Sequence, residues 1–397
     1  MKHLLLLMVI LFPAQLVAHG KANHPAQDKE RAIEFPDVGD YLALTVDLHT
    51  HSVFSDGHVW PRIRVGEALR DNLDALAITE HLEWQPHLED IPHPDRNRAY
   101  LQALEASEGS ELIVIPGSEI TRDAPAGHMN AVFISDANAL IRRPEVKVRA
   151  PFDARAYSDE ASKWPAQDAV AEANRQGAFV FWNHPYWTRQ APDGNARIPE
   201  FHASNAANGL LHGIEIANGH NYSEEAFAIA LEHDLTLVGV SDVHDLVDWD
   251  YQPHDGGHRP VTLVFTRERS ADAIREALFE GRTVVWFENL LIGQEDLIVP
   301  LINASLIVSD ARYLTDTSVL SFTISNVSDA RFMLRNRSGM TFMNAGDLVE
   351  VPAHETVTLQ LKPGKKTESV RIDFDVLNAL TAPKVNPVVS LKVITGR

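Results

Sequence analysis

The sequence predicts an α/β fold, a β/α barrel followed by a small all-β sandwich, from three observations. Apolar runs alternate with helical patterns over residues 41–296, as in parallel strands joined by crossover helices. Seven or eight such units over about 250 residues fit a barrel better than an open sheet. After residues 293–300 the chain becomes rich in Val, Ser and Thr, in short alternating runs separated by turn residues, a pattern typical of a β-sandwich.

The elements follow one another in chain order. Strands are expected at residues 44–48, 75–79, 112–115, 129–134, 178–182, 213–217, 235–240 and 261–265, because each is a short apolar run. Helices are expected at 64–71, 96–107, 166–176, 224–233 and 271–280, where apolar residues recur with helical spacing. The runs 318–324 and 356–361 predict strands of the sandwich, which we place at residues 297–397.

The first 18 residues have the pattern of a secretory signal peptide. Lys2 gives a positive start, residues 4–12 are apolar, and Ala18 offers a small residue before the cleavage point. The apolar run is too short to span a bilayer comfortably. We therefore expect a cleaved signal, a polar leader at residues 19–40, and a periplasmic or secreted protein without a stable membrane anchor.

Composition limits the partners and the metal chemistry. With 35 basic and 55 acidic side chains, the net charge is −20, which disfavours binding to a nucleic acid polymer. A small phosphate-ester substrate remains compatible, since bound cations reverse the charge locally. The chain has no cysteine, so any metal site must use His and carboxylate ligands.

One short motif points to a metal site. His49 and His51 follow the first predicted strand, and residues two apart in an extended segment point to the same face. Asp56 lies beyond a short turn that could bring it to the same point. Two imidazoles and a carboxylate are ligands that Zn²⁺ or Mn²⁺ prefers.

Further ligand-type residues occur at the ends of other predicted strands. Each alone has an ordinary explanation, as a hydrogen-bonded core histidine or a helix cap. In parallel α/β folds, however, the carboxyl ends of the strands open onto one face. Nine ligands on a common rim would suit two or three ions. The additional candidates are His81, Glu119, His128, His184, Asp242 and His244.

These motifs resemble the PHP (polymerase and histidinol phosphatase) family, from about residue 45 to residue 293. The matching segments are His49-x-His51, Ser55-Asp56-Gly57, Thr79-Glu80-His81, Glu119, His128, Asn183-His184-Pro185 and Ser241-Asp242-Val243-His244. Glu80 departs from the pattern, since many members have Asp beside the histidine. The exported start and the β-rich tail further resemble a bacterial phosphodiesterase branch of the family.

The resemblance implies a distorted seven-stranded, TIM-like barrel and up to three ions of Mn, Zn or Fe. It also implies hydrolysis of phosphate esters, with diesters favoured over monoesters, by a hydroxide bridged between metals. Glu119 and Asp242 would be central to catalysis. The implied ligand sets are His49, His51, Glu119 and Asp242 for one ion, Glu119, His128 and His184 for the second, and Asp56, His81 and His244 for the third.

Candidate substrate residues rest on position alone. His220 follows the sixth predicted strand and is either an acid for the leaving group or a loop histidine. His258 and Arg259 lie in a loop after Asp242, and could contact phosphate or be solvated. Arg282 could clamp an anionic oxygen, although a helix-terminal Arg bound to carbonyls is the alternative.

Aromatic and histidine residues near the rim are weaker candidates. Trp187 could line a pocket for an ester group, whereas Trp182 lies inside a strand and is expected in the core. His87 and His93 lie in a Pro-rich loop that could cover the site.

Two other functions compete with phosphoester hydrolysis. An amidohydrolase-like enzyme, cleaving C–N or C–O bonds, commonly carries a bridging lysine after a barrel strand. The barrel region has no Lys at a predicted strand end, and Glu119 fits that position instead. The third possibility is a non-enzymatic metal-binding protein.

Overall fold

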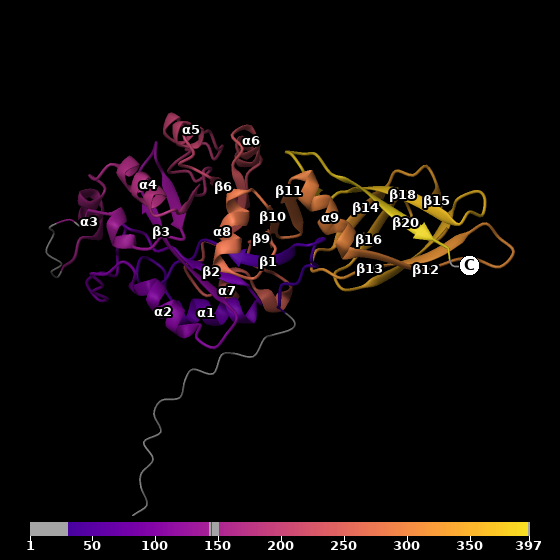
Figure 1. Ribbon diagram of the computed structural model, residues 1–397, viewed down its shortest axis with the longest axis horizontal. Helices are drawn as coiled ribbons and strands as arrows, with labels where there is room; N and C mark the ends of the chain where they lie inside the picture. The colour runs from indigo at the N-terminus through magenta and orange to yellow at the C-terminus, as the bar shows by residue number, and fades with distance from the viewer. Residues whose placement is uncertain (1–30, 143, 145–150, 396–397) are drawn as a thin grey trace, which may run out of the picture.

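One large curled β-sheet is followed by two smaller sheets in the computed structural model, which describes residues 31–142, 144 and 151–395 (Figure 1). The large sheet has the strand order β19-β11-β10-β9-β1-β2-β3-β4-β5-β6-β7, with β8 also paired to β6. Its strands are β1 (Leu42–Asp47), β2 (Ala75–Ile78), β3 (Ile113–Thr121), β4 (His128–Val132), β5 (Phe179–Trp182), β6 (Gly213–Asn218), β7 (Asn221–Tyr222), β8 (Thr236–Val240), β9 (Val261–Thr266), β10 (Thr283–Phe287), β11 (Leu290–Gly293) and β19 (Ala379–Leu380).

The large sheet mixes parallel and antiparallel pairs. Pairs β1–β2, β2–β3, β5–β6 and β6–β8 are parallel, whereas β3–β4, β4–β5, β1–β9 and β9–β10 are antiparallel. The six residues between β3 and β4 are too few for a crossover helix, which explains that antiparallel pair. With twelve strands of mixed direction, the expected seven-stranded TIM-like barrel is not confirmed.

The sheet nevertheless curls until the segments that follow β1 and β8 meet. Thr50 and Val243 form an isolated parallel bridge. Two backbone hydrogen bonds flank it: Asp242 N donates to His49 O over 2.9 Å, and His51 N donates to Val243 O over 3.2 Å. The residues after these two strands are thereby held side by side.

Helices cover the outside of this sheet. Five occur where the sequence predicts them: α1 (Pro61–Arg70), α2 (Arg98–Ala106), α4 (Ala166–Arg175), α6 (Glu224–Glu232) and α8 (Ala271–Phe279). Three others have only one or two turns, too short to show clear periodicity in the sequence: α3 (Ala154–Ala161), α5 (Glu200–Ala207) and α7 (Val247–Asp250). Within the described residues, none of the helices is long and apolar enough to cross a membrane.

The C-terminal part is the predicted β-sandwich. Its sheets have the orders β12-β13-β17-β15 and β16-β14-β18-β20, and apolar residues alternate inward, as Phe322 and Phe374 show. The strands are β12 (Leu306–Tyr313), β13 (Leu320–Asn326), β14 (Phe332–Asn336), β15 (Thr341–Phe342), β16 (Leu348–Val351), β17 (Thr356–Lys362), β18 (Ser369–Val376) and β20 (Val388–Ile394).

The sandwich is packed against the large sheet. Helix α9 (Glu295–Ser305) connects the two parts and begins just before the boundary that we place at residue 297 (Figure 1). Strand β19 returns from the sandwich to pair with β11, with Leu291 opposite Ala379. One hydrophobic cluster includes Trp286 of the large sheet and Phe332 of the sandwich.

A buried histidine of α5 should make stability depend on pH. His202 is fully buried, stacked on the Trp182 ring at 4.3 Å, and burial lowers its pKa to about 3. The ordinary pKa of histidine is 6.5, so as the pH falls His202 is protonated in the unfolded chain before it is protonated in the folded one. The free energy of unfolding therefore decreases between pH 6.5 and 3. At pH 5 the loss should be about 2 kcal/mol, and His202→Phe should abolish it. Denaturant unfolding of both proteins at pH 7 and pH 5 measures this; equal slopes against pH would contradict it.

Candidate metal centre

One rim of the large sheet brings all nine candidate ligands together, from the carboxyl ends of parallel strands and the amino end of the antiparallel strand β4. His49 and His51 follow β1, His81 follows β2, and His184 follows β5. Asp242 follows β8. Glu119 lies within β3, bridged in parallel to His81, and His128 begins β4. His184 and Asp242 have positive φ angles of 28° and 50°, a strained conformation that is found preferentially at functional sites.

The first implied ligand set forms a tight group. His49 Nε2 and His51 Nε2 each lie 3.1 Å from Asp242 Oδ1 and 2.9 Å from one another. The two Glu119 oxygens lie 3.7 Å from His49 Nε2 and 3.6 Å from His51 Nε2. Four donor groups thus face one small volume.

The second set is arranged around Glu119 Oε1. His128 Nδ1 lies 3.0 Å from this oxygen, and His184 Nε2 lies 3.5 Å from it. Asn183 holds the same oxygen by donating a 2.8 Å hydrogen bond from Nδ2. Glu119 therefore faces both groups of histidines, the position required of a bridging carboxylate.

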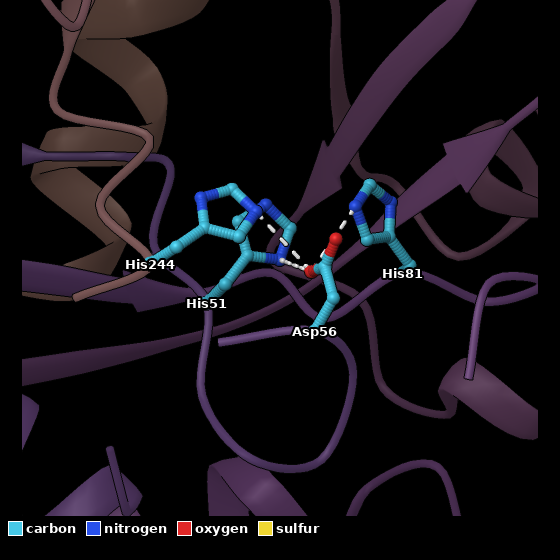
Figure 2. Close-up of side chains that lie close together, drawn as sticks. All are labelled: His51, Asp56, His81 and His244. Atoms are coloured by element: carbon cyan, nitrogen blue, oxygen red, sulfur yellow. Dashed lines mark ion pairs between the residues drawn. The ribbon is translucent and has the colours of Figure 1, made fainter. Parts of the chain in front are cut away.

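The third set surrounds Asp56, which lies between His244 and His51 on one side and His81 on the other (Figure 2). Asp56 Oδ1 is 3.2 Å from His244 Nε2 and 3.4 Å from His81 Nε2. His51 Nδ1 lies 3.9 Å from the same oxygen. The loop after β1 therefore places His49 and His51 in the first ligand set and Asp56 in the third, as the resemblance implies.

The donor atoms fit divalent metal ions. Asp56 Oδ1 and Glu119 Oε2 are buried without a hydrogen bond of good geometry from any described residue, although His81 Nδ1 lies 2.5 Å from Glu119 Oε2. Such atoms are costly unless a cation or water satisfies them. Three groups have ligand atoms within 4.8 Å of one another: His51, Asp56, His81 and His244; His49, His51 and Asp242; and His81, Glu119 and His128. Imidazole with carboxylate suits borderline divalent ions.

The electrostatics favour cation binding. Burial, with His244 and His81 nearby, lowers the pKa of His51 to about 3, so its ring is neutral and can donate a lone pair. Burial opposes ionisation of Asp242, but His49 and His51 outweigh it and hold its pKa far below the ordinary value. Burial likewise opposes the charged form of His49, but Asp242 and the nearby glutamates raise its pKa well above normal. A bound cation would take the place of that proton.

Glu215 is a further candidate residue of this centre, and the sequence motifs do not include it. It is fully buried on β6, with Oε1 2.7 Å from His49 Nδ1. Its Oε2 accepts hydrogen bonds from the backbone N of His184 over 2.7 Å and from Asn218 Nδ2 over 2.8 Å. The carboxylate thereby leaves His49 Nε2 facing Asp242. The available signal was a glutamate inside the apolar strand Gly213–Asn218, where charge is rare unless paired.

We expect Glu215→Gln to weaken metal binding about 10- to 100-fold. The amide keeps the size of the side chain but loses the charge that orients His49 Nδ1–H. Titration of metal-free protein with Mn²⁺ measures the affinity. Glu225→Gln on α6 is the matched control, since Glu225 is bonded to Ser223 outside this centre. An unchanged metal affinity in Glu215→Gln would remove Glu215 from the centre.

Glu80 secures the loop that carries His51. It accepts hydrogen bonds from Ser52 N over 3.1 Å, from the Ser52 hydroxyl, and from Ser55 Oγ over 2.5 Å. Ser55 Oγ lies 3.2 Å from His51 Nδ1. The Glu80 side chain therefore bridges from the end of β2 to the loop after β1.

Comparison with solved structures identifies the family. A crystal structure from Bacteroides vulgatus, of a two-domain protein containing a predicted PHP-like metal-dependent phosphoesterase, is 36% identical and has a TM-score of 0.79. The match covers 91% of this chain and 98% of that one. The chain belongs to the PHP family. A family model described as an Ig-like domain matches residues 306–392, the sandwich of this PHP protein.

Two more distant structures each match about half of the chain. A protein from Bifidobacterium adolescentis described as a metal-dependent phosphoesterase is 21% identical, covers 54% of this chain and 90% of its own, and has a TM-score of 0.36. An amidohydrolase from Chromobacterium violaceum, with bound sulfate and no metal, is 16% identical, covers 50% and 87%, and has a TM-score of 0.34. TM-scores below 0.5 do not establish a shared fold, so neither structure bears on the fold or the function of this chain. No curated protein sequence matches the chain.

The structure places two predicted substrate residues away from the PHP centre. Arg259 is buried and bound to Asp71 at 2.6 Å and to Asp47 at 3.2 Å. Arg282 precedes β10 and donates from Nε to Phe265 O over 3.0 Å, at the end of the sheet where β1 begins. Neither arginine is therefore placed to contact substrate. Buried carboxylates that are distant in sequence bind the guanidinium of Arg259, and a backbone carbonyl binds that of Arg282.

The other two line a cleft between the large sheet and the sandwich. His258 stacks on Trp286 with ring centroids 3.4 Å apart, and the exposed His220 lies 5.0 Å from the Tyr251 ring. Both line a cleft of about 730 Å³ that also contacts Asp329. Neither lines the two clefts found over the PHP ligands in the described structure. Their assignment to substrate therefore stays a prediction without structural support.

The remaining candidates divide between core and cleft. Trp182 is 2% exposed, as expected of a core residue, and donates from Nε1 to Gln190. Trp187 lies over the centre, 5.2 Å from the His128 ring and 5.3 Å from the His184 ring. His93 is buried and bound to Gln85 over 2.6 Å, so it supports its loop instead of facing the cleft.

Proposed function

We propose that the protein is an exported metal-dependent phosphoesterase that hydrolyses small phosphate esters, with diesters favoured over monoesters. The observation that carries the proposal is the convergence of His, Asp and Glu side chains into three metal-sized groups on the PHP barrel. The relative that is 36% identical over nearly its whole length supports the same activity.

The proposal assigns two or three ions of Mn, Zn or Fe to the nine ligands. When bound, such ions lower the pKa of a water molecule and neutralise charge on phosphoryl oxygens. The chain itself holds Glu119 and Asp242 ionised, because nearby histidines outweigh the cost of burial and lower both pKa values. Glu215 orients His49, and Asn183 orients Glu119. The residues thus supply fixed charges that need little reorganisation during reaction.

The shape of the site supports a diester substrate. Two clefts, of about 520 and 580 Å³, share Asp56, His81 and His128. They extend from the ligands in different directions, one toward Asn218 and Asn221 and the other toward α3. A diester carries a substituent on each side of phosphorus, so each cleft could receive one substituent.

Export remains a proposal from the sequence. Residues 1–18, which carry the signal pattern, lie outside the described residues. The net charge of −20 supports a small-molecule substrate over a nucleic acid polymer. Cell fractionation and N-terminal sequencing test export: a mature chain in the periplasm or medium supports it, and a full-length cytoplasmic chain refutes it.

An ester panel tests the catalytic proposal. Purified protein, loaded separately with Mn²⁺, Zn²⁺ and Fe²⁺, is assayed against aryl phosphomonoesters, diesters and triesters, with metal counted by elemental analysis. We expect the fastest hydrolysis with diesters. Cleavage of amides or carboxyl esters alone would favour the amidohydrolase-like alternative, and metal binding without any hydrolysis would favour a non-enzymatic protein.

A further inference from the structure

The cleft toward α3 differs in charge from its neighbour. Arg155, Lys163 and Arg189 line it, whereas the cleft toward Asn218 has no lysine or arginine among its described lining residues. Basic groups are therefore gathered on one side of the metal centre, in a chain with a net charge of −20.

Not every cation of this cleft is available to a ligand. Arg122 also lines it, but its guanidinium is buried, paired with Glu83 and bonded to the carbonyl oxygens of Thr121 and Trp164 over 3.0 and 3.2 Å. That arginine is a structural part of the wall.

The other three cations are free to change partners. Arg155 pairs with Asp159 at 3.0 Å, and Lys163 pairs with Glu160, all four with side chains at least 45% exposed. Exposed pairs of this kind contribute little free energy, so a ligand anion can displace them. Arg189 has no ion pair with any described residue, and its guanidinium lies 5.3 Å from the centroid of the Trp187 ring.

Trp187 connects these cations to the metal centre. Its ring lies 5.2 Å from the ring of His128, so one indole separates Arg189 from a candidate metal ligand. If the phosphoryl group of a substrate lies at the metal ligands and the rest of the molecule lies along the Trp187 ring, the opposite end of the molecule reaches Arg189. Asp123 and Asp159, which also line the cleft, disfavour an anionic group, but the three basic residues outnumber these two carboxylates.

We infer that this cleft binds a second anionic group, a phosphate or a carboxylate, on the part of the substrate remote from the scissile ester. Arg189 contacts that group, with Arg155 and Lys163 supporting it. The inference rests on the proposed phosphoesterase function and narrows its substrate class to esters with two anionic ends.

Binding of non-hydrolysable phosphonates tests this inference without activity. Three probes are titrated calorimetrically into Mn²⁺-loaded protein: benzylphosphonate, 4-carboxybenzylphosphonate and p-xylylenediphosphonate. We expect one or both probes with an anionic far end to bind about tenfold more tightly than benzylphosphonate, since charge-assisted hydrogen bonds are worth that much. The probe that gains affinity identifies carboxylate or phosphate. The gain should shrink at high salt.

Variants locate the effect. Arg189→Gln should reduce the gain and Arg155→Gln/Lys163→Gln/Arg189→Gln should abolish it, with benzylphosphonate affinity unchanged. Arg175→Gln on α4 is the control, because Arg175 pairs with Glu172 on its own helix and lines neither cleft. Equal affinity for all three probes, or a gain that survives the triple variant, overturns the inference. Failure of the proposed function would appear separately, as no ester hydrolysed by the wild-type protein.

Discussion

Replacing Glu119 with Gln is expected to lower phosphoester hydrolysis on the order of 10³-fold. Glu119 is fully buried and lies within 3.7 Å of histidines that belong to all three ligand sets. The amide has nearly the same volume but no charge, and the second set loses its only carboxylate. The histidines around it are His49, His51, His81, His128 and His184.

The measurement is kcat at saturating metal together with metal content by elemental analysis. Both kcat and the metal content should fall, because Glu119→Gln removes a metal ligand and its negative charge together. Glu172→Gln provides a control, since Glu172 is bound to Arg175 and Gln176 on the outer helix α4. If Glu119→Gln keeps its metal and its rate while remaining folded, Glu119 is not a bridging ligand and the proposed mechanism fails.

The ligand cluster was predictable because its pattern is local. Each candidate lies at or just beyond an apolar run, and a curled α/β sheet collects the carboxyl ends of its parallel strands on one face. His49, His51 and Asp242 therefore meet although Asp242 is far away in the sequence. The alternation of strands and helices was predictable for the same reason.

Features that depend on long-range pairing were not predictable. A glutamate inside an apolar strand indicates a buried charge, but its partner His49 lies 166 residues away and no local pattern identifies that contact. The direction of β9, antiparallel to β1, follows from how the chain returns across the sheet, since an apolar run such as Val261–Thr266 fits either direction. Arg259 follows His258 in a Gly-rich, polar loop, which suggests exposure, yet the guanidinium is buried by remote segments.

Replacing Arg259 with Met is expected to destabilise the fold by about 3 kcal/mol. The guanidinium bonds to Asp71 Oδ2 over 2.6 and 2.9 Å and to Asp47 Oδ2 over 3.2 Å, with its side chain fully buried. Burial opposes its charge, but Asp71 and Asp47 outweigh that and raise its pKa. Asp71 keeps a charged second partner in Arg31, whereas Asp47 would keep uncharged donors among the described residues, from Ser241 and the backbone N of His49, so the cost lies mainly at Asp47.

Denaturant unfolding separates this role from the substrate contact that the sequence suggested. A buried ion pair predicts a lower unfolding midpoint with KM nearly unchanged at temperatures where the variant is folded. A phosphate contact predicts the reverse, a higher KM with an unchanged midpoint. Arg197→Met controls for loss of charge alone, because Arg197 pairs with Asp193 on the surface and should leave the midpoint unchanged. Asp47 also accepts a 3.2 Å hydrogen bond from the backbone N of Ser241, the residue before the candidate ligand Asp242. If Arg259→Met loses both stability and bound metal, this buried network also holds the metal ligands in position.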